Sequence, residues 1–153
     1  MPAEQSKRDL PWHSPQFYQE AHAVAASRVR FGQHNAKPIL VVDFSRADLD
    51  LVRAVAAECL HVMSAQPPCS VLSLCEVEGI PFSTEALRIG GELTDKCQLY
   101  ASRTALSGVT GFRSFLLQAI ANAAGRPMKL FKDREAALDW LVSEGSQSAT
   151  SGG

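Results

Sequence analysis

Residues 38–44, PILVVDF, form a run of strand length that is apolar on both of its faces, and this run limits the folds open to the chain. Strands of this kind lie inside mostly parallel sheets whose two faces are covered by helices. Residues 52–63 follow with apolar side chains at the spacing of one helical face. Ser45 is the predicted N-cap of this helix, with Asp48 three residues later as in a capping box. A buried strand and an amphipathic helix in this order predict a βα unit.

The same alternation of strand and helix patterns continues along the chain. Further strands are predicted at residues 28–31, 70–77, 103–107 and 128–131, and further helices at 83–97, at 112–123 and after Asp133. The first two strands, joined by a turn at 34–37, form an antiparallel hairpin, and each later strand is reached through a helix. The predicted fold class is therefore α/β. It is a mostly parallel five-stranded sheet with an N-terminal antiparallel hairpin and four helices, and residues 38–44 are placed at its centre.

These patterns give two single residues a structural role. Gly125 falls just after the helix of residues 112–123, where a C′ glycine in the left-handed conformation often ends a helix. Trp140 falls on the apolar side of the last helix, and we expect it to anchor that helix in the core.

One domain is expected, at residues 27–144. Residues 1–26 are predicted to be a largely disordered N-terminal tail, because their first 15 positions hold three prolines and no apolar periodicity. A short helix at residues 16–26 is the alternative for part of this segment. Residues 145–153, GSQSATSGG, are small and polar and are predicted to be a disordered C-terminal tail.

The composition sets limits on the partners. Among the 153 residues, 15 Lys and Arg balance 16 Asp and Glu, which gives a net charge of -1, and 46% of the residues are hydrophobic. Nucleic acids and anionic membrane surfaces attract an excess of positive charge, so we expect neither as a partner. No apolar run approaches the roughly 18 residues of a membrane span, and the N-terminus lacks the apolar segment of a secretory signal. We therefore expect a cytoplasmic protein of bacterial type.

The cysteines and histidines show no metal-binding pattern. The four cysteines form no CxxC pair, and the four histidines form no His-x-x-x-His pair and have no acidic partner at ligand spacing. We therefore expect no metal and no other cofactor. The cysteines are interpreted as reduced thiols that pack as small hydrophobic side chains. They are Cys59, Cys69, Cys75 and Cys97.

Three stretches of the sequence resemble one known family. They are residues 38–45, PILVVDFS, residues 66–74, QPPCSVLSL, and residues 105–141, which begin with ALSGVTGF and end with AALDWL. Over about residues 28–144 the chain resembles the SpoIIAA-like family, which is part of the STAS (sulfate transporter and anti-sigma-factor antagonist) fold group. The resemblance implies an α/β domain that is not an enzyme and that binds a partner protein, often a kinase-like anti-sigma factor.

The resemblance also implies a regulatory serine. In members of the family this serine stands at the N-terminus of a helix, usually in a D-S-x-G context, and it is phosphorylated. Ser83 matches that position best and Thr84 is adjacent, while Phe82 replaces the acid and the following glycine is missing. A phosphoryl group at a helix N-terminus would gain from the unpaired backbone N–H groups and the helix dipole. In the simpler interpretation, Ser83 or Thr84 is only the N-cap of the helix.

A second candidate site lies where strands are predicted to end. Gly108, Thr110 and Gly111 stand between a strand and a helix. Glycines there allow backbone N–H groups to face an anion. In the simpler interpretation, they only allow a tight turn from strand to helix. Asp43 ends its strand at the sheet edge where ligands of parallel sheets bind. It is either an acidic residue of a binding cleft or a hydrogen-bond acceptor for the following loop. Asp43 and Glu76, at the ends of two strands, would be the carboxylates of a hydrolase.

Three functions follow from these residues. The first is a non-enzymatic STAS-like regulatory or protein-interaction module, which binds another protein through Phe82, Ser83 and Thr84 and is switched at a hydroxyl group of the helix start. The alternative is a domain that binds a small anionic or lipid-like ligand, and the third is a hydrolase. An enclosed apolar cavity would favour the ligand, whereas a flat, apolar-edged surface around Phe82 would favour the protein partner.

Overall fold

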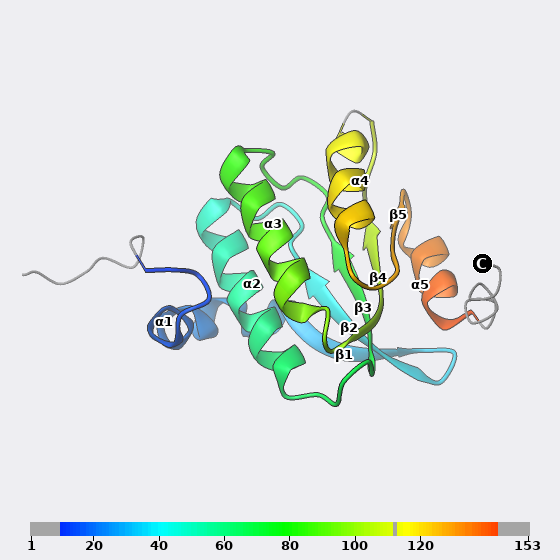
Figure 1. Cartoon of the computed structure of the whole chain (residues 1–153), viewed down its shortest axis with the longest axis horizontal. Coiled ribbons are helices and arrows are strands. Elements are labelled where there is room, and N and C mark those ends of the chain that lie inside the picture. Colours follow the sequence, from blue (N-terminus) through cyan, green and yellow to red (C-terminus); the bar gives the residue numbers. More distant parts are fainter. Residues whose placement is uncertain (1–9, 112, 144–153) are drawn as a thin grey trace, which may run out of the picture.

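The computed structural model of the chain describes residues 10–111 and 113–143, which form one five-stranded sheet with helices on both sides (Figure 1). The strands are β1 (Val29–His34), β2 (Lys37–Asp43), β3 (Val71–Glu76), β4 (Ala101–Ser107) and β5 (Met128–Phe131). They lie in the sheet in chain order, β1 is antiparallel to β2, and every later pair is parallel. The predicted α/β class, with a mostly parallel sheet and an antiparallel hairpin at its start, is confirmed.

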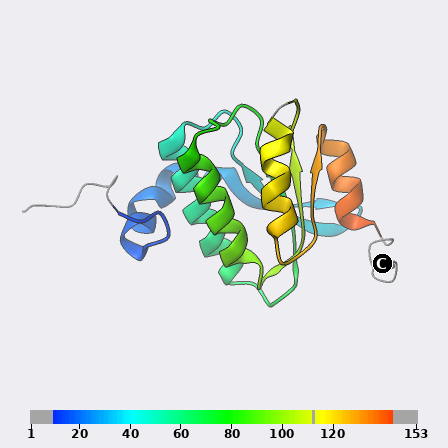
Figure 2. The same ribbon diagram turned by 45° about the horizontal axis from the view of Figure 1, so that its top comes forward.

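The helices divide between the two faces of the sheet. They are α1 (Pro15–Ala25), α2 (Leu49–Ser64), α3 (Thr84–Cys97), α4 (Arg113–Ala123) and α5 (Arg134–Val142), with a short 3-10 turn at Ala26–Arg28. Helices α2, α3 and α4 lie over one face and α5 lies on the other (Figure 1 and Figure 2). Right-handed crossovers between neighbouring strands place successive helices on the same face. Four helices follow strands as predicted, and α1 is added before the first strand.

Alternate side chains of β2 enter two separate cores. Leu40 and Val42 lie in the larger core, under α2, α3 and α4, whereas Ile39 lies in the smaller core, under α5. All three are fully buried, as a strand that is apolar on both faces requires. Leu138 and Leu141 of α5 complete the smaller core.

The place of β2 within the sheet differs from the prediction. The sequence pattern places residues 38–44 at the centre, but β3 is the middle strand and β2 lies between β1 and β3. Each crossover adds its strand on the side away from the hairpin, so the second strand in the chain is also second in the sheet. Burial on both faces distinguishes an inner strand from an edge strand, and it does not distinguish one inner strand from another.

Residues 10–26 are ordered, which corrects the prediction of a largely disordered tail over residues 1–26. α1 packs along α2 through buried side chains spaced four residues apart. They are Phe17, Ala21 and Ala25. Ser14 caps α1, because its hydroxyl oxygen accepts a hydrogen bond from the backbone N–H of Phe17. Pro15 occupies the first helical position, where its missing N–H is not needed. Pro15 therefore begins a helix instead of preventing one.

The other tail predictions fall outside the part of the chain that the structure describes. They concern residues 1–9 and 145–153. The domain therefore begins earlier than predicted, since Trp12 is already in the larger core with 2% of its surface exposed.

The loop between β2 and α2 corrects the predicted helix cap. The N-cap of α2 is Asp48, whose carboxylate accepts a hydrogen bond from the backbone N–H of Leu51 at 2.9 Å. Ser45, the predicted N-cap, instead donates its hydroxyl and its backbone N–H to the carboxylate of Asp43. Both residues are good capping types, and the helix begins at the later of the two because the loop needs the first to close its own turn.

Gly125 and Trp140 also differ in part from their predicted roles. Gly125 follows α4, but its backbone is not left-handed, and a Cβ there would lie 1.8 Å from the side-chain oxygen of Gln98. Turn geometry therefore does not require a glycine here, and a larger residue would displace the end of the Gln98 side chain. Trp140 is half-buried at the edge of the smaller core, with its ring centroid 5.8 Å from that of Phe131, while Leu141 is fully buried. The centre of the contact between α5 and the sheet is therefore Leu141.

Candidate functional site

A cavity of about 110 Å³ lies between the sheet and helices α2, α3 and α4. Its wall is almost entirely apolar and draws on both strands and helices. Wall residues include Met63, Val77, Ile89, Leu93, Leu106 and Leu117. An engineered apolar cavity of about 150 Å³ in another protein stays dry and binds benzene. The cavity of this protein therefore has room for a small apolar molecule.

Polar groups on the cavity wall are few and already hydrogen-bonded. The hydroxyls of Ser73 and Thr104 lie 3.0 Å apart and share a hydrogen bond, and Thr94 donates to the carbonyl of Gly90 at 2.8 Å. Within the described residues, no buried side-chain nitrogen or oxygen atom lacks a hydrogen-bond partner. An apolar molecule can therefore enter without separating a polar group from its partner.

Arg126 is the one charged residue among the described residues of the wall. It is half-buried, its Nε donates to the backbone carbonyl of Gln98 at 3.0 Å, and its Nη2 lies 2.7 Å from Sγ of Cys69. A guanidinium has five N–H donors, so these two contacts leave others for a ligand. An anionic group could pair with Arg126 while the apolar part of the same molecule lies in the cavity.

Three of the four cysteines lie on the wall of this cavity. Cys59 of α2 and Cys97 of α3 hydrogen-bond to one another, and Cys75 of β3 lies close enough to interact with both. The hydrogen bond to Cys97 and then burial raise the pKa of Cys59 well above its ordinary value. Burial, with smaller effects of Cys97 and Glu76, raises the pKa of Cys75 to about 12. Cys59 and Cys75 are therefore neutral thiols at physiological pH and form an apolar part of the wall.

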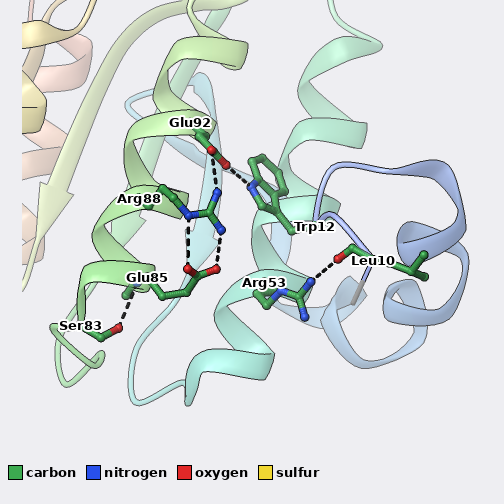
Figure 3. Close-up of polar contacts among 8 residues, drawn as sticks. Leu10, Trp12, Arg53, Ser83, Glu85, Arg88 and Glu92 are labelled. Carbon is green, nitrogen blue, oxygen red and sulfur yellow. Dashed lines mark hydrogen bonds and ion pairs between the residues drawn. The ribbon is translucent and has the colours of Figure 1, made fainter. Parts of the chain in front are cut away.

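The predicted partner-binding residues lie at the start of α3. Ser83 is the N-cap, and its Oγ accepts a hydrogen bond from the backbone N–H of Ala86 at 3.0 Å (Figure 3). The predicted N-cap role of Ser83 is confirmed, and both Ser83 and Thr84 are exposed. Phe82 is half-buried and belongs to the cavity wall. The apolar group beside the capping hydroxyl thus lines the cavity instead of standing on a flat surface.

The outer side of α3 carries an ion-pair network that the N-terminal segment covers. Arg88 pairs with Glu85 and Glu92, and Trp12 donates its indole N–H to Glu92 at 2.8 Å (Figure 3). The hydrogen bond from Trp12 is the main reason that the pKa of Glu92 is lowered, and the hydrogen bond from Arg88 lowers the pKa of Glu85. Arg53 of α2 holds the same segment by donating to a backbone carbonyl. Part of the surface next to the start of α3 is therefore already occupied by the chain itself.

The two strand-end carboxylates lie on the other face of the sheet. Asp43 and Glu76 are register partners on β2 and β3, so they do meet at one edge. Each carboxylate is already engaged, because Asp43 accepts two hydrogen bonds from Ser45 and Glu76 pairs with Arg134 of α5. Neither residue lines the apolar cavity. Asp43 thus has the second of its two predicted roles, the hydrogen-bonding of the following loop.

The predicted ligand loop lies beside the cavity and does not line it. Gly108, Thr110 and Gly111 connect β4 to α4, and both glycines have positive φ, at 84° and 65°. A Cβ on Gly108 would lie 2.9 Å from Cβ of Glu78, so the loop after β3 and the loop after β4 touch here. Gly108 and Thr110 share a separate hollow of about 150 Å³ with Phe82. The structure therefore brings the two predicted sites together at the carboxyl edge of the sheet.

The sequence did not reveal the cavity or Arg126. The wall residues of α2, α3 and α4 fall on the apolar faces that the periodicity assigns to a packed core, and periodicity does not report whether that core is filled. For Arg126 the signal was its position, since a lone charged residue stands between the end of α4 and the short strand β5.

The comparisons with known proteins agree with this fold. No protein-family model matches the sequence, and no curated protein matches it. The structure is similar to that of an uncharacterized protein of the DUF3478 family with a SpoIIAA-like fold from Shewanella loihica PV-4. The two chains share 15% sequence identity and a TM-score of 0.58, over 74% of this chain and 91% of the other. The chain therefore has the SpoIIAA-like fold of the STAS group, as the sequence resemblance implied.

None of the described helices combines the length and the apolar composition that crossing a bilayer requires.

Proposed function

We propose that this protein is a non-enzymatic binding module whose ligand is a small, mainly apolar molecule held between the sheet and helices α2, α3 and α4. The observation that carries the proposal is the cavity of about 110 Å³ with its apolar, hydrogen-bond-satisfied wall. Burial of apolar surface contributes about 25 cal/mol per Å², so a molecule of a few carbon atoms gains several kcal/mol by entering. A packed interior would normally leave no space of this size.

The position of Arg126 favours a ligand with one anionic end. It supplies the charge on an otherwise uncharged wall, and charge-assisted hydrogen bonds to a guanidinium are among the stronger ones in proteins. A short-chain carboxylate combines the two features, with its chain in the cavity and its carboxylate at Arg126. This is the class of ligand that the sequence analysis kept as its alternative to a protein partner.

Binding of a protein partner at Phe82, Ser83 and Thr84 is the second function that we propose. Its support is the position of Phe82, which lines the ligand cavity and stands next to two exposed hydroxyl residues at a helix start. A ligand that displaces Phe82 would alter the surface beside Ser83, and a phosphoryl group on Ser83 would alter the same surface. The two uses of this region are therefore compatible with one regulatory module.

Calorimetric titration of the full chain with butanoate and with 1-butanol, whose chains suit a cavity of about 110 Å³, tests the ligand proposal. Cys97→Leu places additional carbon atoms in the cavity from α3, so we expect it to keep the melting temperature and to weaken the binding of both probes at least tenfold. Lys96→Leu is the matched control, because it places the same side chain on the exposed side of α3. We expect its affinity for both probes to equal that of the unmodified protein.

Arg126→Gln separates the two ends of the ligand. We expect this variant to bind butanoate at least tenfold more weakly and 1-butanol with unchanged affinity, because only the carboxylate pairs with the guanidinium. The proposal is wrong if Cys97→Leu binds both probes as well as the unmodified protein does, or if neither probe shows saturable binding.

A further inference from the structure

A second group of functional side chains lies far from the cavity, where the tip of the β1–β2 hairpin meets α5. His34 is the last residue of β1, and the turn that follows it is tight, with positive φ at both Asn35 and Ala36. The Nε2 atom of His34 lies 3.0 Å from a carboxylate oxygen of Asp139 on α5. The two residues are 105 positions apart in the sequence. The fold thus places an imidazole from the hairpin directly against a carboxylate of the last helix.

A second carboxylate completes the group. Glu135 lies one helical turn before Asp139, and one ligand atom from each of Glu135, Asp139 and His34 lies within 4.8 Å of the other two. Among the described residues, no lysine or arginine forms an ion pair with either carboxylate. Two like charges at this helical spacing destabilise a helix unless a cation neutralises them.

We propose that His34, Glu135 and Asp139 form a binding site for a divalent transition-metal ion of the zinc class. An imidazole nitrogen with two carboxylate oxygens is a donor set that Zn²⁺ accepts, whereas Mg²⁺ and Ca²⁺ prefer oxygen ligands alone. Three protein ligands leave at least one position for water. The exposure of both carboxylates leaves the site open to ions from solution.

The metal would fasten the hairpin to α5, because its ligands come from these two elements and from no other. An ion that binds the folded chain and not the unfolded chain stabilises the fold by mass action. The proposal departs from the expectation that the chain has no metal site. That expectation rested on ligand spacing along the sequence, and here the imidazole is brought in from a distant hairpin.

Calorimetric titration of the untagged full chain with ZnCl2 tests this site. The titration uses a Cys69→Ser background, so that the exposed thiol of Cys69 does not compete for zinc. We expect one Zn²⁺ per chain, and binding at least tenfold weaker in His34→Ala and in Glu135→Gln. His61→Ala, which removes an exposed histidine elsewhere, is the control and should bind as the parent does.

Thermal unfolding gives a second measurement. We expect ZnCl2 to raise the melting temperature of the parent by several degrees, EDTA to reverse the increase, and Glu135→Gln to remove it. Glu135 is exposed, so this variant folds whether or not the metal matters. Zinc binding of parent strength in both His34→Ala and Glu135→Gln, or no saturable binding by the parent below millimolar ZnCl2, would overturn the proposal.

Discussion

The four cysteines of this chain occupy two kinds of environment, and their reactivity should differ accordingly. Cys69 is exposed and has the guanidinium of Arg126 beside its sulfur, whereas Cys75 is on the cavity wall with its pKa raised to about 12. We expect brief treatment of the native protein with iodoacetamide near pH 8 to alkylate Cys69 first, because only the thiolate reacts and only this thiol is open to solvent. Mass spectrometry of the digested protein would locate the label.

Denatured protein is the control for this experiment, since all four cysteines should then react. Labelling of Cys75 as fast as Cys69 in the native protein would contradict the assignment of Cys75 to a dry wall.

The contact between Trp12 and Glu92 should make stability depend on pH. The pKa of Glu92 is lowered in the folded state from its ordinary value of 4.5, chiefly by the indole N–H. A lowered folded pKa stabilises the fold above the ordinary pKa, and this stabilisation is lost as the pH falls through the lowered value. We therefore expect Trp12→Phe, which keeps an aromatic ring and removes the N–H, to lose less stability than the unmodified protein between about pH 5 and pH 3.

Urea unfolding at a series of pH values would measure this difference. Glu92→Gln is the matched variant, and it should show the same reduced dependence as Trp12→Phe. Equal losses in all three proteins would show that the indole does not control the titration of Glu92.

The burial and the contacts of single residues were the least predictable features of this structure. The sequence pattern chose Trp140 as the buried anchor, but Trp12 is the tryptophan that is buried, with 2% of its surface exposed. Trp140 lies in a recognisable helical face, whereas Trp12 lies in a proline-containing stretch without periodicity. Its burial depends on a slot between α2 and α3 that exists only in the folded chain.

Secondary-structure elements were predicted more completely than single residues. The strands were recognised from alternating or continuously apolar runs of strand length, and the four later helices from the period of 3.6 that burial of one face imposes. The order of the strands followed less directly, since burial on both faces does not say which inner strand is the middle one. The predicted position of the N-cap of α2 was wrong because Ser45 and Asp48 are both capping residue types, and only the geometry of the loop selects between them.

The N-cap of α3 gives a prediction at this scale. Ser83→Ala removes the hydrogen bond to the N–H of Ala86, and we expect it to lower the free energy of unfolding by about 1 kcal/mol. Ser83→Asp should keep the melting temperature within a few degrees, because aspartate is also a good N-cap and its charge suits a helix N-terminus. Thermal or urea unfolding of both variants would measure these values.

Thr84→Ala is the control for the cap, because Thr84 is exposed and lies inside the first turn of α3. An effect of Ser83→Ala no larger than that of Thr84→Ala would show that the capping bond does not stabilise this helix.

On the scale of the whole molecule, α5 is the one described helix that covers its face of the sheet. Leu141 is fully buried there against the strands. We expect Leu141→Ala to lower the free energy of unfolding by about 2–5 kcal/mol, the range for a leucine removed from a core that cannot fully collapse. Urea unfolding monitored by circular dichroism would measure the loss. With EDTA present, so that no metal contributes, Glu135→Ala on the exposed side of the same helix should change it by less than about 0.5 kcal/mol.

The candidate sites were predictable only in part at this scale. Asp43, Gly108, Thr110 and Gly111 could be placed where strands end, because parallel strands end together at the carboxyl edge of the sheet. The cavity and the group around His34 could not be predicted. The first is a failure of side chains to fill space, and the second joins residues 105 positions apart.

The position of α5 at the end of the element order also has a consequence for biosynthesis. Helices α2, α3 and α4 each follow a strand directly, so the larger core can fill while the chain is being made. The smaller core waits for residues 134–142, and until they leave the ribosome the side chains of Ile39, Leu74 and Ala105 face water. At about 5–20 residues per second, the sheet is exposed on this face for several seconds. We therefore expect a nascent chain of this protein to present chaperones with a defined apolar surface, the one that α5 will cover.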